Sequence, residues 1–212
     1  MKLTVLGATG GTGVQVVQRA LDDGHQVTAI VRDPAKLPAG LRDRAEVVTA
    51  DVRDAAALTP HVQGRDAVIT ALGTREGRAP TTICTDGARG LIEAMRAAGT
   101  SRLLLVSASG LAADSGDGPV TRYVFKPLLQ RVLKENFTDL RRAEELVRAS
   151  GLDWTIVRPP RLLNGPAKGA YRSTVDRNVR GGRTIRRADL AAALLDLAPG
   201  TGNVGHVVCV AG

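Results

Sequence analysis

Cysteine, aromatic residues and long apolar runs are all scarce in this chain. Its two cysteines, Cys84 and Cys209, lie far apart with no metal-ligand spacing around them, which argues against a disulfide framework and predicts buried free thiols. No stretch approaches the roughly 20 apolar residues of a membrane-spanning helix, and the apolar run at 3–6 is too short for the core of a signal peptide. We therefore expect a cytoplasmic protein with no membrane partner.

Acidic residues are also outnumbered, with 21 Asp and Glu against 29 Lys and Arg and a net charge of +8. A positive net charge of this size is typical of proteins that bind nucleic acid, because lysine and arginine neutralise its phosphates. The arginines are spread along the chain, however, and aromatic residues, on which bases would stack, make up only 2% of it, so we expect no nucleic-acid partner. One basic segment, 158–187, has Asp176 as its sole counter-charge and is either a solvated surface or a site that attracts an anionic substrate or cofactor phosphates. Its cations include Arg161, Lys168, Arg172, Arg177, Arg180, Arg183 and Arg186.

The sequence does contain a regular alternation of short apolar runs and longer helical patterns, with 43% hydrophobic residues in a chain of 212. Apolar, β-branched runs predict about seven strands, at 2–6, 26–31, 46–49, 66–71, 102–107, 153–158 and 204–210. Helices are predicted at 11–23, 54–62, 82–98, 127–149 and 188–197, and loops at 74–80, 112–119 and 164–182. This order predicts one α/β domain, residues 1–212, with a doubly wound, mostly parallel sheet flanked by helices and with small substrate-side loops near the C-terminus.

A glycine-rich segment stands where the first predicted strand passes into the first predicted helix. In its G-x-x-G-x-x-G spacing, Gly7 suits a tight turn, Gly10 lets the backbone approach a pyrophosphate, and Gly13 lets the helix sit close to the sheet. A glycine-rich turn without a ligand is the alternative, but the position between strand and helix favours a Rossmann-type dinucleotide site. The predicted cofactor-binding residues here are Gly7, Thr9, Gly10, Gly11, Thr12 and Gly13.

The end of the second predicted strand bears on which dinucleotide binds. The residue just past this strand reads the adenosine ribose, with an acid favouring NAD and an arginine favouring NADP. Arg32 offers a fork of donors to a 2′-phosphate, and Lys36 adds a point charge nearby. Asp33 would accept from a 2′-hydroxyl if the strand ran one residue longer, so NADP(H) is favoured and NAD(H) is the alternative.

Several segments together resemble the atypical short-chain dehydrogenase/reductases, in the branch of NmrA-like and flavin (biliverdin) reductase-like NAD(P)H-binding proteins. The resemblance rests on residues 7–13, 31–36, 90–94, 106–109, 150–159 and 187–191, and so spans nearly the whole chain. It implies further cofactor contacts, with two residues beside the adenine, three along the cofactor ribose and one bordering the nicotinamide. These are, in that order, Asp51 and Val52, then Ala71, Leu72 and Gly73, then Pro159.

The chain departs from the wider family in its catalytic pair. Dehydrogenases of this group carry Tyr-x-x-x-Lys one helical turn apart, and this sequence has no such pair. Tyr123 and Lys126 are one residue too close, and alignment of the later helix places Asn136 and Leu140 at the family's tyrosine and lysine positions. A ketone or alcohol reaction, which needs a positioned proton donor, is therefore disfavoured.

Flavins, quinones and similar conjugated acceptors take a hydride without such a donor. We therefore expect an NADPH-dependent oxidoreductase, acting as a monomer, that reduces a small-molecule conjugated acceptor. Ser107 matches the family's catalytic serine position and either hydrogen-bonds the substrate or nicotinamide amide, or caps local backbone. The alternative function is a non-catalytic NADP(H)-sensing regulator that binds a protein partner, for which the predicted helix at 127–133 offers an apolar surface. A third is a sugar-nucleotide or isoflavone-type reductase relative with a relocated acid.

Overall fold

The computed structural model describes residues 1–73, 80–114 and 116–212, so most of the predicted loop at 74–80 lies outside the described residues. An eight-stranded sheet runs in the order β3-β2-β1-β4-β5-β6-β10-β8, and among these strands only β8 is antiparallel to its neighbour. The strands are β1 Lys2–Leu6, β2 Gln26–Val31, β3 Glu46–Thr49, β4 Ala67–Thr70, β5 Arg102–Val106, β6 Asp153–Arg158, β8 Arg172–Val175 and β10 His206–Ala211. A small second sheet pairs β7 Arg161–Leu163 with β9 Thr184–Arg186.

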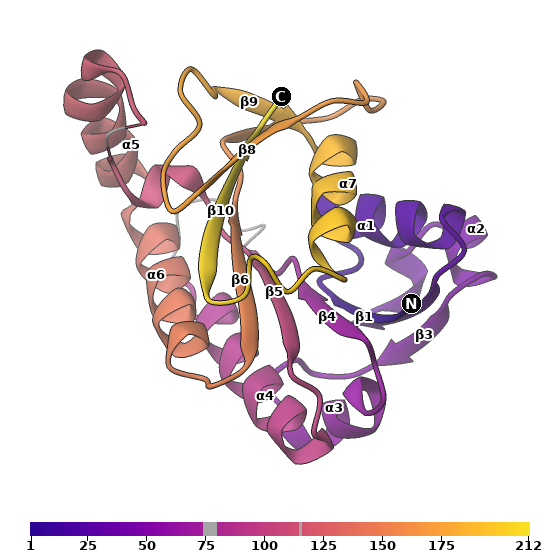
Figure 1. Cartoon of the computed structure of the whole chain (residues 1–212). Helices are drawn as coiled ribbons and strands as arrows, with labels where there is room; N and C mark the ends of the chain where they lie inside the picture. Colours follow the sequence, from indigo (N-terminus) through magenta and orange to yellow (C-terminus); the bar gives the residue numbers. More distant parts are fainter. Residues whose placement is uncertain (74–79, 115) are drawn as a thin grey trace.

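Helices cover both faces of the large sheet (Figure 1). On one face α1 packs against α7, and on the other α4 lies between α3 and α6. These helices are α1 Gly11–Asp22, α3 Ala55–Val62, α4 Ile83–Ala98, α6 Lys134–Arg148 and α7 Arg187–Leu197. Shorter helices are η1 Pro34–Lys36, α2 Ala39–Arg42, η2 Ser109–Leu111, the π-helical turn η3 Thr121–Phe125 and α5 Lys126–Val132.

Two hydrophobic cores, one on each face, explain why the central strands are apolar throughout. Leu3 and Val5 of β1 point into the core shared with α1 and α7, whereas Leu6 belongs to the core shared with α3, α4 and α6. Successive side chains of a strand point to opposite faces, so a strand covered by helices on both sides has no solvent-facing position. The doubly wound Rossmann-type α/β fold predicted from the sequence is confirmed.

The strand order reverses between β1 and β4. The chain leaves β1 toward β2 and β3 on one side, then returns to form β4 on the other, with Leu6 in register with Thr70. Gly7 and Ala71 are therefore neighbours at the carboxyl edge of the sheet, meaning the edge where the parallel strands end. In open α/β sheets this switch point leaves a crevice in which ligands bind.

The prediction of about seven strands was too low, because β7, β8 and β9 were missed. β8 lies inside the predicted loop at 164–182; its sequence is polar and it is largely exposed at the sheet edge, so it has no apolar alternation to reveal it. The predicted helix at 127–149 is in fact two helices that separate at Leu133. They contact different surfaces, since α5 packs on η2 and α6 packs along α4.

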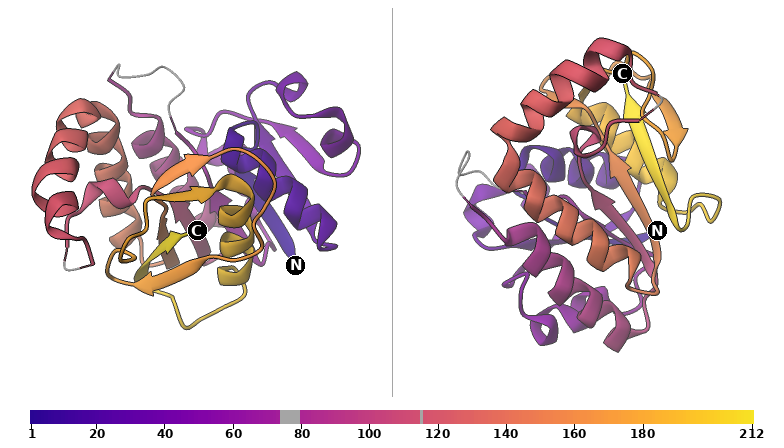
Figure 2. Two further views of the ribbon diagram at one scale, coloured as in Figure 1. Left: turned by 90° about the horizontal axis from the view of Figure 1, so that it is seen from above. Right: turned by 90° about the vertical axis from the view of Figure 1, so that its left-hand side faces the viewer.

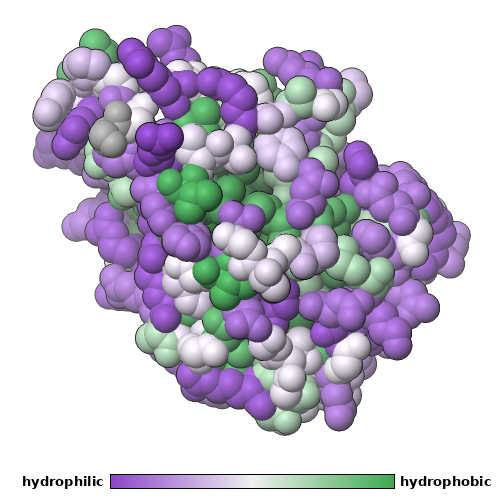
Figure 3. Space-filling model, in the orientation of Figure 1, coloured by the Kyte–Doolittle hydropathy of each residue, from purple (hydrophilic) through white to green (hydrophobic). Residues whose placement is uncertain are grey.

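The outer surface of the protein is mostly hydrophilic on the face shown in Figure 3. Among the described residues no helix is both long and apolar enough to cross a membrane. In the space-filling view most of the visible face is hydrophilic, and hydrophobic residues gather near its centre, between α6 and α7 (Figure 3). Helix α5 projects from the body of the molecule at the upper left of Figure 1.

Candidate functional site

The turn from β1 into α1 has a backbone that only glycine satisfies at two positions. Gly7 has φ +75°, and a Cβ atom there would lie 2.6 Å from the Ala71 carbonyl oxygen. A Cβ on Gly13 would lie 2.1 Å from the Gly7 carbonyl oxygen, so the first turn of α1 rests directly on the preceding turn. Gly10 is the N-cap of α1 and donates its N–H to Gly7 O at 2.8 Å. The turn therefore leaves the N-terminus of α1 open at the carboxyl edge.

A cleft of about 370 Å³ lies beside this turn. It is lined by the glycine turn, the ends of β2 and β4, the segment after β3 and the start of α4. Eight of the predicted site residues line it, namely Gly7, Thr9, Gly10, Arg32, Val52, Ala71, Leu72 and Gly73. The other six do not: Gly11, Thr12 and Gly13 lie in the first turn of α1, Asp51 just before Val52, and Ser107 and Pro159 after the ends of β5 and β6. The roles assigned to all fourteen residues stay predictions.

Two glycines of α4 explain how that helix approaches the cleft. A Cβ on Gly87 would lie 2.4 Å from Leu72 Cδ1, and one on Gly90 would lie 2.6 Å from the Val52 carbonyl oxygen. Helix α4 is thus pressed against the segments that follow β3 and β4. This contact accounts for Gly90 in the sequence segment at 90–94 and fixes the wall of the cleft formed by Val52 and Leu72.

Arg32 is the first residue after β2, because that strand ends at Val31. Its side chain is exposed at the cleft and makes no ion pair with any described residue. Asp33, by contrast, caps η1 by accepting from the Ala35 N–H at 3.0 Å, and it pairs with Lys36 at 3.6 Å. Asp33 and Lys36 therefore serve the local turn, and of these three charged residues only Arg32 lines the cleft.

Arg53 also lines the cleft and was missed by the sequence analysis. Its guanidinium binds the Asp51 carboxylate, with Nε to Oδ1 at 3.0 Å and Nη2 to Oδ2 at 2.6 Å. This hydrogen bonding, helped by the Arg53 N–H and the charge of Arg32, lowers the pKa of Asp51 to about 2. Asp86 also lines the cleft, and its carboxylate pairs with Arg89 at 3.3 Å. With Arg53 paired to Asp51, Arg32 is left as the cation of the cleft that has no ion pair among the described residues. The position of Arg53 just after β3 was a signal that could have revealed it.

Ser107 follows β5 and lies in a buried polar network. Its hydroxyl donates to Glu144 Oε1 at 2.6 Å, and the same oxygen accepts from Arg158 Nε at 2.8 Å. Arg158 Nη2 donates to the second carboxylate oxygen of Glu144, and Glu144 is only 3% exposed. Because the proton of Ser107 is directed to Glu144, the serine oxygen is left to act as an acceptor. The sequence analysis assigned neither Glu144 nor Arg158.

Comparison with protein families identifies the family of this chain. Residues 7–199 match the model of the NAD(P)H-binding family. The chain belongs to this family. The match begins at the glycine turn and covers β2, β4 and α7. It confirms both the predicted cofactor class and the predicted kinship with NAD(P)H-binding proteins.

Individual relatives resemble the chain over most of its length. The protein YwnB of Bacillus subtilis is 28% identical over 203 residues, which cover 92% of this chain and 91% of YwnB. The chloroplastic protein At2g34460 of Arabidopsis thaliana is 34% identical over 180 residues, but these cover 61% of that longer protein. A short-chain dehydrogenase/reductase of Veillonella parvula, solved in complex with NADP, shares the fold with a TM-score of 0.82 at 19% identity, over 100% of this chain and 94% of its own.

One solved neighbour is described by its activity. ChuY of Escherichia coli O157:H7, described as an anaerobillin reductase, is 25% identical with a TM-score of 0.75, over 100% of this chain and 97% of ChuY. Together with the family match, such neighbours show that the chain is an NAD(P)H-binding protein with the fold of oxidoreductases.

The shape and charge of the cleft fit NAD(P)H. Gly10, the N-cap of α1, adds no side chain of its own at the helix N-terminus, where helix N–H groups bind phosphates. Arg32, with no carboxylate within 4 Å among the described residues, is suited to a 2′-phosphate. Tyr123 and Lys126 take no part, since Tyr123 is 71% exposed and the buried ammonium of Lys126 binds Asp117 and the Ala112 carbonyl.

The two cysteines are buried free thiols, as predicted. Burial raises the pKa of both thiols, that of Cys209 to about 11. Both therefore stay protonated at neutral pH, and a protonated thiol is a poor nucleophile. Covalent chemistry at cysteine is accordingly no part of the function proposed below.

Replacing Arg32 with alanine is expected to weaken NADPH binding by about 1.5 to 3 kcal/mol, because a charge-assisted contact to the 2′-phosphate is lost. NADH has no such phosphate, so its affinity should change little. Calorimetric titration of both dinucleotides measures the difference. Arg42→Ala, which removes an exposed arginine of α2, is the matched control. Equal losses for NADPH and NADH would remove the assignment of Arg32 to the 2′-phosphate.

Proposed function

We propose that the protein is an NADPH-dependent reductase of the atypical short-chain dehydrogenase/reductase type, which transfers a hydride to a flavin, quinone or similar conjugated acceptor. The observation that carries the proposal is the family's cofactor cleft, with Arg32 at its rim, in a chain that has no Tyr-x-x-x-Lys pair. The cleft supports dinucleotide binding. The missing pair favours an acceptor that needs no positioned side-chain acid.

When bound, NADPH would supply a hydride to a conjugated acceptor, and water would supply the balancing proton. The chain's own residues then have to bind and orient the cofactor and the acceptor, and to shield them from water. The glycine turn and Arg32 hold the adenosine and phosphate end. At the other end, the Ser107 oxygen would accept a hydrogen bond from an amide N–H of nicotinamide or substrate, because its hydroxyl donates its own hydrogen bond to Glu144. The Glu144–Arg158 pair fixes that orientation from within the protein.

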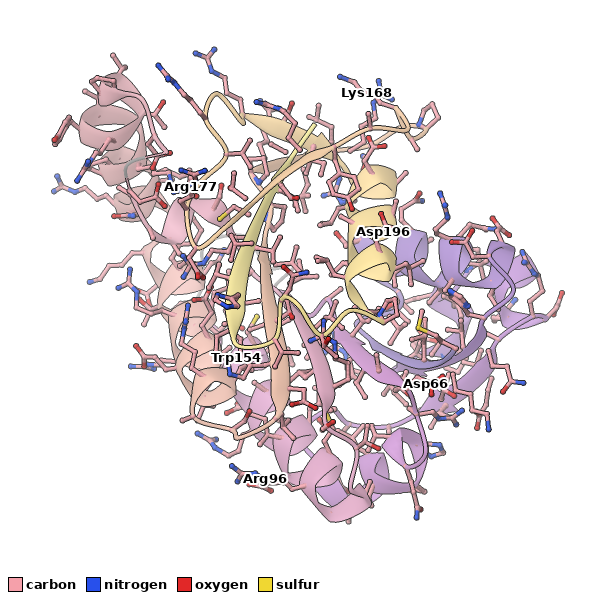
Figure 4. The ribbon with its side chains drawn as sticks, viewed as in Figure 1. Asp66, Arg96, Trp154, Lys168, Arg177 and Asp196 are labelled. Atoms are coloured by element: carbon pink, nitrogen blue, oxygen red, sulfur yellow. The ribbon has the colours of Figure 1, made fainter. Side chains whose placement is uncertain are left out.

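Charge near the carboxyl edge favours a negatively charged acceptor. In Figure 4, Lys168 and Arg177 lie toward the end of the molecule with β8 and β9, whereas Asp66, which precedes β4, lies at the other end. The basic segment at 158–187 is thus on the side of the cleft. Acceptors with phosphate or carboxylate groups, such as flavin nucleotides and linear tetrapyrroles, match this charge. The description of ChuY as an anaerobillin reductase supports the same class.

The proposal is tested by following NADPH oxidation with the purified protein and a panel of FMN, riboflavin, soluble quinones and biliverdin. We expect turnover with at least one acceptor class, faster with NADPH than with NADH. Each acceptor is also tested with Gly10→Val, whose rate gives the background that does not depend on bound cofactor. NADPH binding without turnover on any acceptor would refute the reductase and support the alternative that follows.

The alternative is an NADP(H)-sensing regulator that binds a protein partner. A specific observation favours it, since three apolar side chains in and just before η3 and α5 are exposed, namely Val120 at 66%, Val124 at 60% and Leu128 at 61%. Exposed apolar patches of this kind often mark interaction surfaces. We prefer the reductase because α5 packs on η2, which follows β5, so the same helices also lie beside the carboxyl edge of the sheet, where the acceptor would bind.

A further inference from the structure

Arg187, the first residue of α7, lies against the first turn of α1. A Cβ atom on Gly11 would be 2.9 Å from Arg187 Nε and 3.2 Å from its Cδ. Gly11 is the first residue of α1 and has an ordinary negative φ, so the lack of a side chain there leaves room for Arg187. Figure 2 shows α7 beside α1, and the segment that carries β7 to β9 passes over them in the view from above.

The charge at this place is not balanced by the described protein. The first turn of α1 contains no acidic residue, and its N-cap, Gly10, has no side chain with which to cap the helix. Within the described residues no carboxylate lies within 4 Å of Arg187, whose Nη1 donates to Asn164 Oδ1 at 2.6 Å. A cation is disfavoured at a helix N-terminus, because the helix dipole is positive there. The arrangement is therefore complementary to an anion.

The guanidinium of Arg187 is also held in place. Asp189, in the same first turn of α7, is only 2% exposed and accepts from the N–H groups of Lys168 at 2.9 Å and Gly169 at 3.1 Å. With the Arg187–Asn164 hydrogen bond, this ties segment 164–169 to the start of α7. Arg187 is thus a preorganised cation, and such a group loses little conformational entropy when it binds a ligand.

We propose that Arg187 donates hydrogen bonds to the pyrophosphate of the cofactor, from the opposite side of the glycine turn to Arg32. The family match indicates which anion would bind beside Arg187, because in this fold the pyrophosphate of a dinucleotide binds at the N-terminus of the first helix. The inference rests on the cofactor-binding half of the proposed function and not on the acceptor. It assigns two phosphate sites to two arginines, Arg32 for the 2′-phosphate and Arg187 for the pyrophosphate.

The contributions of Arg187 and Arg32 are distinguished by measuring dissociation constants by calorimetry for NADPH, NADH, ADP-ribose and adenosine 2′-monophosphate. Arg187→Ala should raise the Kd of the first three ligands by about tenfold or more and leave that of adenosine 2′-monophosphate unchanged, because only that ligand lacks a pyrophosphate. Arg32→Ala should give a different pattern, with NADH and ADP-ribose spared. Arg183→Ala, an exposed arginine of the same basic segment, controls for net charge.

Arg187→Gln guards against misfolding, because its amide retains a donor for Asn164 while the charge is removed. Unchanged ADP-ribose affinity in both Arg187 variants, with normal thermal unfolding, would overturn the inference. Gly11→Ala should displace the guanidinium and weaken ADP-ribose binding in the wild-type background more than in the Arg187→Ala background. Equal effects in the two backgrounds would contradict the placement of Arg187. Failure of the acceptor panel alone would refute the reductase and leave this assignment intact.

Discussion

Gly10→Val is expected to abolish binding of NADPH and NADH alike, raising both dissociation constants by about 100-fold or more, which corresponds to roughly 3 kcal/mol. The backbone at Gly10 has φ −75° and ψ 159°, a conformation that valine adopts readily. A Cβ there would be 3.1 Å from the Gly7 carbonyl oxygen, which requires a shift of only a few tenths of an ångström. The valine methyl groups would then fill the space that the pyrophosphate needs. Calorimetry with both dinucleotides measures the loss.

The choice of glycine separates a binding defect from a folding defect. Gly7 and Gly13 are unsuitable for this test, because a side chain at either position would collide with backbone at 2.6 and 2.1 Å. At Gly40, on α2, an added Cβ would have no neighbouring atom within 4 Å, so Gly40→Val is the matched control and should bind both cofactors normally. Retained NADPH affinity in a folded Gly10→Val protein would mean that the glycine turn holds no pyrophosphate.

The large sheet was predictable because its strands are apolar on both faces. β1, β2 and β3 have the predicted bounds, because each is a short apolar run and a glycine, proline or charged residue near its ends marks where it stops. β7 and β9 have only three residues each, and β8 is polar, so their pairing depends on where the rest of the fold places them. The local sequence pattern contains no information about where the rest of the fold places these strands. The break at Leu133 was hidden for the same reason, because it depends on what α5 and α6 pack against.

The cofactor side of the site was predictable and the interior side was not. The glycine spacing and Arg32 are local features that follow strands, and the structure brings eight of the predicted residues to one cleft. Glu144, by contrast, meets Ser107 across a separation of 37 residues. Arg187 meets Gly11 only because α7 packs on α1. Such contacts join distant segments, and a single sequence gives no measure of which segments will meet.

Arg102 stabilises α7 from its other end. The helix has no basic residue in its last turn, and Arg102 of β5 supplies the missing cation by donating to the carbonyls of Leu197 at 2.6 Å and Ala198 at 3.0 Å. The same guanidinium donates to the Asp153 carbonyl and to Thr155 Oγ1. Burial lowers the pKa of Arg102, but its ordinary value is so high that the group stays charged at neutral pH. Four acceptors in the protein therefore depend on one buried cation.

Arg102→Met should lower the free energy of unfolding by about 3 kcal/mol, because methionine fills most of the volume but leaves the helix carbonyls without their donor. For a chain of this length, that loss corresponds to a fall in Tm of about 6 to 12 °C in calorimetry. Arg96→Met is the control, since exposed Arg96 also donates two hydrogen bonds to a backbone carbonyl, that of Ser150. It should cost less than about 1 kcal/mol, because water replaces an exposed donor. Equal losses in the two variants would show that burial adds nothing to this cap. NADPH affinity, measured well below Tm, should stay normal in Arg102→Met, because Arg102 lies at the opposite end of α7 from Arg187.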